Sequence, residues 1–245
     1  LEFRRVLFRT RDYCRRGSRW LQVRYVFNMQ VLYRVLYTRR YRLNRHPKGP
    51  LASPPFDHFG ILAPLYERLI PNVNVKILES LLKLDPRQPL LDVGGGTGRV
   101  SRFFQDKVER ICILDFSAGM LRQARASGGF ETCQGVAEAI PFPSDSFQRI
   151  LAVDSFHHYR HQARAAQELV RILAPGGRMV IEEPDIHRFS VRLIALMETI
   201  TLMRSRFYPP AEVAEMFTAA GGQVHIYENG GPNFWVIVEK PSSWG

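Results

Sequence analysis

The sequence has few cysteines and lacks long apolar runs. Its three cysteines, Cys14, Cys112 and Cys133, form no Cys-x-x-Cys pair, so neither a zinc site nor a disulfide framework is expected. The longest charge-free run near the N-terminus, Tyr25 to Tyr33, is far shorter than the roughly 20 apolar residues that a membrane span needs. No apolar segment followed by a small-residue cleavage site indicates a signal peptide. We therefore expect a protein of the reducing cytoplasm, without a metal site and without a membrane span.

Acidic residues are nearly absent from residues 1–50. This segment holds 14 Lys and Arg against 2 Asp and Glu, whereas residues 51–245 hold 20 against 21, so the formal charge of +11 resides in the segment. Leu1 to Arg9 resembles translated sequencing-adapter sequence, and we interpret residues 1–50 as a basic N-terminal extension that is artefactual or disordered. The alternatives are a basic helix in peripheral contact with a membrane and an RNA-binding arm. The nearly neutral remainder needs no anionic substrate, so nucleic acid is not an expected partner.

Residues 51–245 are long enough for one domain with an ample core. Apolar runs predict strands at 89–93, 110–115, 130–134, 149–154 and 178–183, separated by helix-compatible segments. Such alternation predicts a parallel, doubly wound α/β sheet. A helix at 209–220 and two short strands at 223–228 and 234–239, joined by a Gly-rich turn, add an antiparallel pair. Apolar positions at helical spacing between Phe59 and Leu69 predict a helical N-terminal cap.

An acid and three alternating glycines stand between the first strand and a helix-compatible run: Asp92, then Gly94, Gly96 and Gly98. Glycines at such a joint let the backbone approach a ligand closely, and a helix that follows aims its N-terminus at an anionic group. The dinucleotide fingerprint Gly-x-Gly-x-x-Gly fails from Gly94, because Arg99 occupies the third glycine position. The pattern Asp-x-Gly-x-Gly-x-Gly instead resembles the cofactor loop of class I S-adenosylmethionine (SAM)-dependent methyltransferases. A nicotinamide oxidoreductase is therefore disfavoured.

Three further segments resemble the same family, in the same order. The second strand ends in Asp115 within the run 115–121, residues 137–143 resemble the segment between strands three and four, and 168–178 resemble the helix–Pro-Gly-Gly–strand five joint. An acid about 20 residues after the glycine loop is placed to accept hydrogen bonds from a ribose diol, although it could also cap the helix from Ser117. The resemblance covers roughly residues 55–240 and is closest to the branch with the ubiquinone/menaquinone C-methyltransferases.

The resemblance implies a Rossmann-like, doubly wound sheet of seven strands, mostly parallel with an antiparallel C-terminal strand. It implies SAM as the cofactor, with binding roles for Asp92, Gly94, Gly95, Gly96, Gly98, Asp115, Phe116, Met120, Ala137, Glu138, Asp154 and Ser155. Phe116 and Met120 are expected to pack on the adenine. One position departs from the family pattern, because Val136 stands where many relatives have an Asp that accepts from the adenine amino group. The backbone near Ala137, or the Glu138 side chain, is expected to contact the ring edge instead.

The acceptor side is less defined by sequence. Asp154 to Tyr159 follow the fourth strand, and either His157 or His158 could act as a base near neutral pH. We select His158 as the candidate catalytic residue, against the alternative that the pair only caps helix and loop. Glu182, Glu183 and Asp185 are interpreted as solvent-exposed loop acids, with the alternative that one of them faces the acceptor. An apolar stripe in residues 189–204 predicts a lid over the acceptor, or ordinary core packing.

These observations predict a cytoplasmic, SAM-dependent methyltransferase. Its expected acceptor is a small, apolar or aromatic molecule that is methylated on oxygen or carbon, and the sequence does not identify this molecule or the oligomeric state. A non-catalytic SAM-binding domain is one alternative, and the departure at Val136 supports it. An RNA methyltransferase that uses the basic N-terminal arm is another. Since a sulfonium methyl group needs positioning more than activation, the motifs identify no obligatory catalytic residue.

Overall fold

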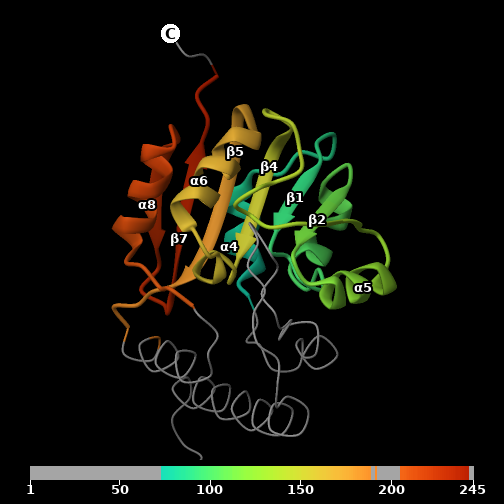
Figure 1. Ribbon diagram of the computed structural model, residues 1–245, viewed down its shortest axis with the longest axis horizontal. Coiled ribbons are helices and arrows are strands. Elements are labelled where there is room, and N and C mark those ends of the chain that lie inside the picture. The colour runs from blue at the N-terminus through green and yellow to red at the C-terminus, as the bar shows by residue number, and fades with distance from the viewer. Residues whose placement is uncertain (1–72, 189–190, 192–204, 243–245) are drawn as a thin grey trace, which may run out of the picture.

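The computed structural model describes residues 73–188, 191 and 205–242. They form one sheet with helices on both faces (Figure 1). Three sequence predictions lie outside the described residues: the basic extension 1–50, the cap helix between Phe59 and Leu69, and all but Val191 of the segment 189–204.

The sheet has seven strands in the order β3-β2-β1-β4-β5-β7-β6. The strands are β1 (Leu90–Val93), β2 (Ile111–Asp115), β3 (Glu131–Gln134), β4 (Phe147–Val153), β5 (Leu173–Pro184), β6 (Gln223–Glu228) and β7 (Asn233–Glu239). The first five pair in parallel, whereas β7 is antiparallel to both of its neighbours, β5 and β6. Every residue of β1 and β2 is buried, as expected for parallel strands with both faces covered. The predicted fold class is confirmed.

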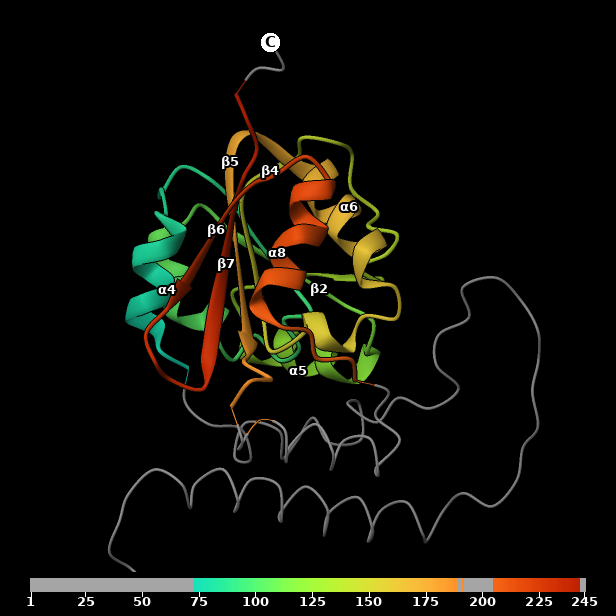
Figure 2. The ribbon, with the colours of Figure 1, turned by 90° about the vertical axis from the view of Figure 1, so that its left-hand side faces the viewer.

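Helices cover the two faces of the sheet and divide the core. On one face α4 (Val75–Leu82), the 3-10 helix η1 (Ser101–Lys107) and α5 (Ala118–Ser127) pack on Leu90, Ile113 and Val180. On the other, α6 (Gln162–Ile172) and α8 (Pro210–Ala219) pack on Leu91 and Ile181. Figure 2 shows α8 beside β6 and β7 at one edge of the sheet. This layering brings the carboxyl ends of β1, β2, β4 and β5 to one edge, where ligands of doubly wound sheets bind.

Two local features differ from the sequence prediction. The segment after the glycine loop is a short 3-10 helix that begins at Ser101, rather than a helix from Arg99. The Pro-Gly-Gly segment at 175–177 does not end α6, which stops at Ile172, but lies within β5. It is held there by β7, because Gly176 N–H donates to Lys240 O and Lys240 N–H donates to Gly177 O. Gly176 does adopt the expected positive φ, at 71°.

Cys112 is a core residue, as predicted. It lies in β2 with 7% of its surface exposed, and burial raises the pKa of its thiol to about 12. Within residues 73–188, 191 and 205–242, no helix is long and apolar enough to cross a membrane.

Candidate functional site

The glycine loop at residues 94–98 has a backbone that only glycine adopts readily. Gly94, Gly96 and Gly98 have φ values of +73°, +57° and +77°. A Cβ at Gly94 would lie 2.6 Å from Ser155 Cβ, and one at Gly95 would lie 2.4 Å from the Asp92 carboxylate. Backbone geometry therefore favours glycine at positions 94, 96 and 98, and close packing against Ser155 and Asp92 excludes a side chain at positions 94 and 95. The loop is a cradle of main-chain atoms at the end of β1, and η1 is too short to add a strong helix dipole.

Asp92 lies beneath this loop. Its side chain is 2% exposed, and Ser101 Oγ donates to Asp92 Oδ2 at 2.6 Å. Burial raises the pKa of Asp92 to about 7, and the negative charge of Asp115 adds to the shift, while Ser101 and the Arg99 charge oppose it. The carboxyl group thus supports the loop from the sheet side and is strongly coupled to the charges around it.

Asp115 joins the end of β2 to the glycine loop. Its Oδ2 accepts Gly96 N–H at 2.9 Å and its Oδ1 accepts Ser117 N–H at 2.8 Å. The cap of α5 is Ser117, whose Oγ accepts Met120 N–H, so the expectation that Asp115 itself caps this helix is wrong. The two backbone bonds hold the carboxylate at the position where a ribose diol is expected in this fold.

Three of the residues expected near the adenine, Met120, Ala137 and Glu138, are buried. Met120 is 2% exposed, and its Sδ lies 3.9 Å from where a Gly96 Cβ would be, so it packs beside the loop. Ala137 is buried between Val136 and Ala139, which form an isolated antiparallel bridge. The Glu138 carboxylate accepts His161 N–H at 3.0 Å, at the N-terminus of α6. Contacts of Phe116, Met120, Ala137 and Glu138 with adenine stay predictions.

The segment after β4 closes the other side of the loop. Asp154 has a positive φ of 50°, and its carboxylate lies 3.8 Å from the guanidinium of Arg99. Ser155 Oγ and Tyr159 OH both donate to Val93 O, at 3.1 and 3.0 Å. Burial raises the pKa of Tyr159 well above its usual range, so this phenol stays protonated and keeps its bond. Asp154 and Ser155 therefore lie next to the glycine loop, and their contact with the cofactor stays a prediction.

The two adjacent histidines point to different partners. His157 lies in the 3-10 helix η2 (Phe156–His158) with its ring Nδ1 2.6 Å from Glu183 Oε2. His158 has its Nδ1 3.0 Å from Ser205 Oγ. Burial lowers the pKa of His158 well below its usual value, and the nearby His157 lowers it further. His158 is thus neutral near pH 7, and its surroundings disfavour the protonated ring. Among the described residues no group of three or more metal-ligating side chains occurs.

The interpretation of three C-terminal acids as exposed loop residues is wrong. Glu182 and Glu183 lie inside β5 and Asp185 directly follows it, and their exposed fractions are 1%, 3% and 5%. Glu182 accepts from Asn233 Nδ2 and Trp235 Nε1, at 2.7 and 2.9 Å. Burial raises the pKa of Glu182 to about 7. The sequence does place Glu182 and Glu183 at the end of a strand, where two adjacent side chains face opposite sides of the sheet. It does not show that both sides are covered there, so their burial could not be predicted.

The sheet order, the glycine cradle and the acid at the end of β2 together define the fold of a class I SAM-dependent methyltransferase domain. The comparison with known families agrees, because residues 91–181 match the family described as "Methyltransferase domain". SAM is the cofactor that this domain implies. The residues present fit it, since the positive φ values of Gly94, Gly96 and Gly98 leave a loop of main-chain atoms and the Asp115 carboxylate is held beside this loop by Gly96 N–H.

Two curated relatives are named as methyltransferases of quinone biosynthesis or of demethylmenaquinone. The chain is 32% identical over 104 residues to the ubiquinone/menaquinone biosynthesis C-methyltransferase UbiE of Pseudomonas syringae pv. syringae, covering 38% of this chain and 41% of the relative. It is 33% identical over 99 residues to the demethylmenaquinone methyltransferase of Renibacterium salmoninarum, covering 40% and 42%. The chain thus spans about two fifths of the length of the curated relatives it matches.

Solved structures share the fold at low identity. A putative methyltransferase from Bacillus halodurans has a TM-score of 0.60 at 18% identity, covering 69% of this chain and 99% of that one. The [4+2]-cyclase SpnF has a TM-score of 0.59 at 16% identity, covering 72% and 81%. Since a cyclase appears beside methyltransferases, this structural likeness shows the fold alone.

Proposed function

We propose that the chain transfers a methyl group from SAM to a small, apolar or aromatic acceptor, on oxygen or on carbon. The carrying observation is that the glycine loop, Asp115 and the segment 154–159 meet at one edge of the sheet. The two relatives named above, a ubiquinone/menaquinone biosynthesis C-methyltransferase and a demethylmenaquinone methyltransferase, support an aromatic acceptor of this kind. The proposal includes a reducing, cytoplasmic location, and the buried, unpaired Cys112 supports it.

When bound, SAM supplies an electrophilic methyl group on a sulfonium. The glycine loop would let the backbone approach the cofactor, and Asp115 would accept hydrogen bonds from its ribose hydroxyls. The segment after β4 would exclude water and orient the acceptor, and orientation is the main requirement of a methyl transfer by displacement. His158, neutral near pH 7, accepts the proton that an acceptor hydroxyl or ring carbon loses. The products are the methylated acceptor, a proton and S-adenosylhomocysteine.

Isothermal titration of the full chain with SAM tests the cofactor site. We expect binding, and we expect Asp115→Asn to weaken it by about 1–3 kcal/mol, or roughly 5- to 150-fold, because a charge-assisted acceptor is lost. Asp145→Asn is the control, since Asp145 is an exposed acid with a positive φ that Asn tolerates, and its partner is Lys240. No binding at millimolar SAM, or an equal effect of both variants, would contradict this assignment.

Release of S-adenosylhomocysteine with a panel of quinols and phenols tests the reaction. We expect turnover with at least one of these acceptors and a large loss in His158→Ala, whereas His161→Ala keeps most of the activity. SAM binding without turnover across the panel would instead favour the alternative of a non-catalytic SAM-binding domain. That alternative is supported by the departure at Val136.

A further inference from the structure

The carboxylate of Glu183 collects four donors from one short segment. Oε1 lies 3.1 Å from Ser155 N and 2.8 Å from Phe156 N, and Oε2 lies 3.3 Å from His157 N and 2.6 Å from His157 Nδ1. Glu183 and His157 are 3% and 4% exposed, so these bonds are shielded from water. No side chain of η2 caps its own N-terminus. The start of η2 is therefore fixed from β5, through Glu183.

The segment that Glu183 holds also supports the cofactor loop. Ser155 donates through Oγ to Val93 O, the carbonyl directly before Gly94. Its Cβ occupies the space that a Gly94 side chain would need, only 2.6 Å from that position. Because interiors are close-packed, a shift of the Ser155 backbone changes the support beneath Gly94. Glu183 thus supports the cofactor loop indirectly, through its hydrogen bond to the backbone of Ser155.

The same segment holds residues 205–207 on its other side. His157 O accepts Arg206 N–H at 2.8 Å, and the His157 ring stacks on Phe207 with centroids 4.4 Å apart. Gln162 Nε2 donates to both Phe156 O and Arg206 O, each at 2.9 Å. Residues 205–207 are therefore tied to the segment that Glu183 holds, at the acceptor side of the proposed site.

We propose that Glu183 is a positioning residue that places residues 155–157 between the cofactor loop and residues 205–207, and that it keeps His157 as the Nδ1–H tautomer. This inference rests on the proposed function for its effect on SAM. Three backbone N–H groups already donate to the carboxylate, so the His157 ring must be the donor at Nδ1. The other ring nitrogen, Nε2, is then the basic one. A glutamine cannot replace Glu183, because its amide nitrogen would face donors.

The test compares Glu183→Gln with Glu168→Gln in the full chain. Glu168 is a matched control, because its carboxylate also accepts a backbone N–H, from Ile140, and pairs with Arg171 on α6. Titration calorimetry measures the Kd of SAM, and nitrogen-15 NMR, with His157→Gln for assignment, measures the tautomer of His157. We expect the Nδ1–H tautomer in the wild type and in Glu168→Gln, and its loss in Glu183→Gln. We expect the Kd to rise about tenfold in Glu183→Gln and less than twofold in the control.

Glu183→Asp keeps the charge but withdraws the carboxylate by one methylene, and it serves if Glu183→Gln does not fold. We expect the Nδ1–H tautomer to persist there, with a smaller rise in the Kd of SAM. An unchanged Kd and an unchanged tautomer in Glu183→Gln would overturn the inference, and so would an Nε2–H tautomer in the wild type. A wild-type chain that has the Nδ1–H tautomer but binds no SAM would overturn the proposed function, and it would leave the pairing of Glu183 with His157 intact.

Discussion

At the scale of single residues, the functional edge of the sheet is built around buried acids. Asp92, Asp115, Glu182 and Glu183 are each at most 7% exposed, and each accepts at least one hydrogen bond. Buried carboxylates are costly unless donors surround them, so each acid fixes the group that donates to it. Asp115 could be selected from sequence as a candidate because of its distance from the glycine loop, and the structure places it against Gly96; its contact with a ribose stays a prediction. Glu183 could not be selected in this way, because its donors come from a segment 26 to 28 residues away.

Glu182 predicts how stability depends on pH. Burial and the negative charge of Asp154 raise its folded pKa to about 7, from an ordinary value of 4.5. Between these values the folded chain binds more protons than the unfolded chain, so the free energy of unfolding falls as pH rises from about 4.5 to about 7. Asp92 contributes with the same sign. We expect a smaller difference in unfolding free energy between pH 5 and pH 8 in Glu182→Gln.

Urea unfolding at pH 5 and pH 8 measures this difference, which we expect to be on the order of a few kcal/mol in the wild type. The comparison concerns the pH difference and not the absolute stability, because a glutamine has only one side-chain oxygen, where Glu182 uses two to accept from Asn233 Nδ2 and Trp235 Nε1. Glu215→Gln, an exposed change on α8, should retain the wild-type difference. A wild-type stability that rises between pH 5 and pH 8 would show that other groups dominate.

At the scale of elements, the glycine loop shows what the sequence could predict. The spacing of Gly94, Gly96 and Gly98 predicted close backbone approach, and all three adopt a positive φ. The spacing could not show which side chains pack against the loop, because Ser155 and Phe130 reach it only once the sheet and its helices are assembled. For the same reason, the Pro-Gly-Gly segment was interpreted as a turn. Its inclusion in β5 depends on pairing with Lys240, which is remote in sequence.

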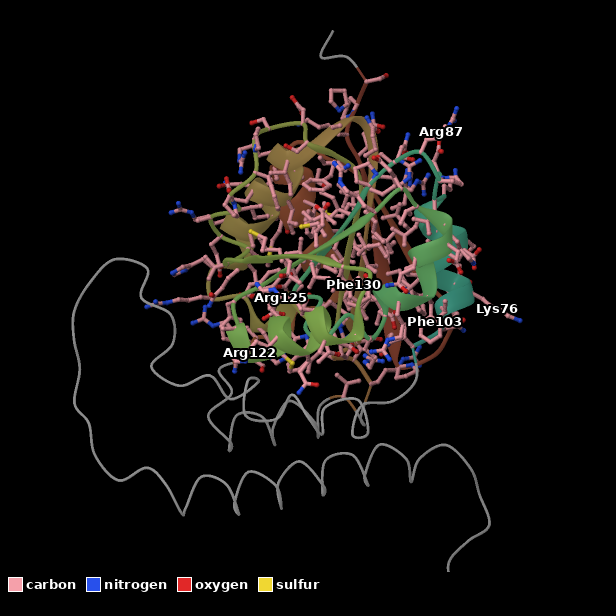
Figure 3. The ribbon with its side chains drawn as sticks, turned by 90° about the vertical axis from the view of Figure 1, so that its right-hand side faces the viewer. Lys76, Arg87, Phe103, Arg122, Arg125 and Phe130 are labelled. Atoms are coloured by element: carbon pink, nitrogen blue, oxygen red, sulfur yellow. The ribbon has the colours of Figure 1, made fainter. Side chains whose placement is uncertain are left out.

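Two glycines with the same φ of +77° differ in what surrounds them. A Cβ at Gly98 would lie 2.6 Å from the ring of Phe130, which is partly buried against the core, whereas one at Gly128 meets nothing within 4 Å. Figure 3 labels Phe130, and it shows Lys76 projecting outward from the domain. Gly128 also has a ψ of 162°, a conformation essentially restricted to glycine, so Gly128→Ala should cost about 1–3 kcal/mol from strain alone. Gly98→Ala should cost about 1–3 kcal/mol more, from overpacking.

Urea unfolding of both variants measures the difference. Phe130→Ala in the Gly98→Ala background should recover part of the additional cost, giving a non-additive pair, while Phe130→Ala and Gly128→Ala should add. Equal costs at Gly98 and Gly128 would mean that the Phe130 ring moves aside freely and that the loop is less closely packed than the structure shows.

At the scale of the whole molecule, charge and cofactor chemistry lie in different parts of the chain. The excess of positive charge resides in residues 1–50, whereas the nearly neutral remainder contains the glycine loop and Asp115. A ligand bound by backbone cradles and one carboxylate should respond weakly to salt. A polyanion bound by the basic segment should respond strongly, through counterion release. The salt dependence of binding therefore separates a small-molecule methyltransferase from an RNA methyltransferase that uses the basic arm.

Thermal unfolding of the full chain with SAM, NAD or a short RNA tests this separation. At a SAM concentration of 100 times Kd, mass action raises the free energy of unfolding by about 2.7 kcal/mol, or roughly 5–10 °C in Tm. We expect this shift to persist when the ionic strength rises from 50 to 200 mM, and we expect NAD to give none, because Arg99 replaces the third glycine of its fingerprint. Any RNA binding should weaken by orders of magnitude over the same range.

An equal shift with NAD would restore the oxidoreductase alternative, since the cradle would then accept a pyrophosphate. A SAM shift that required RNA would instead indicate that the acceptor is bound through residues 1–50.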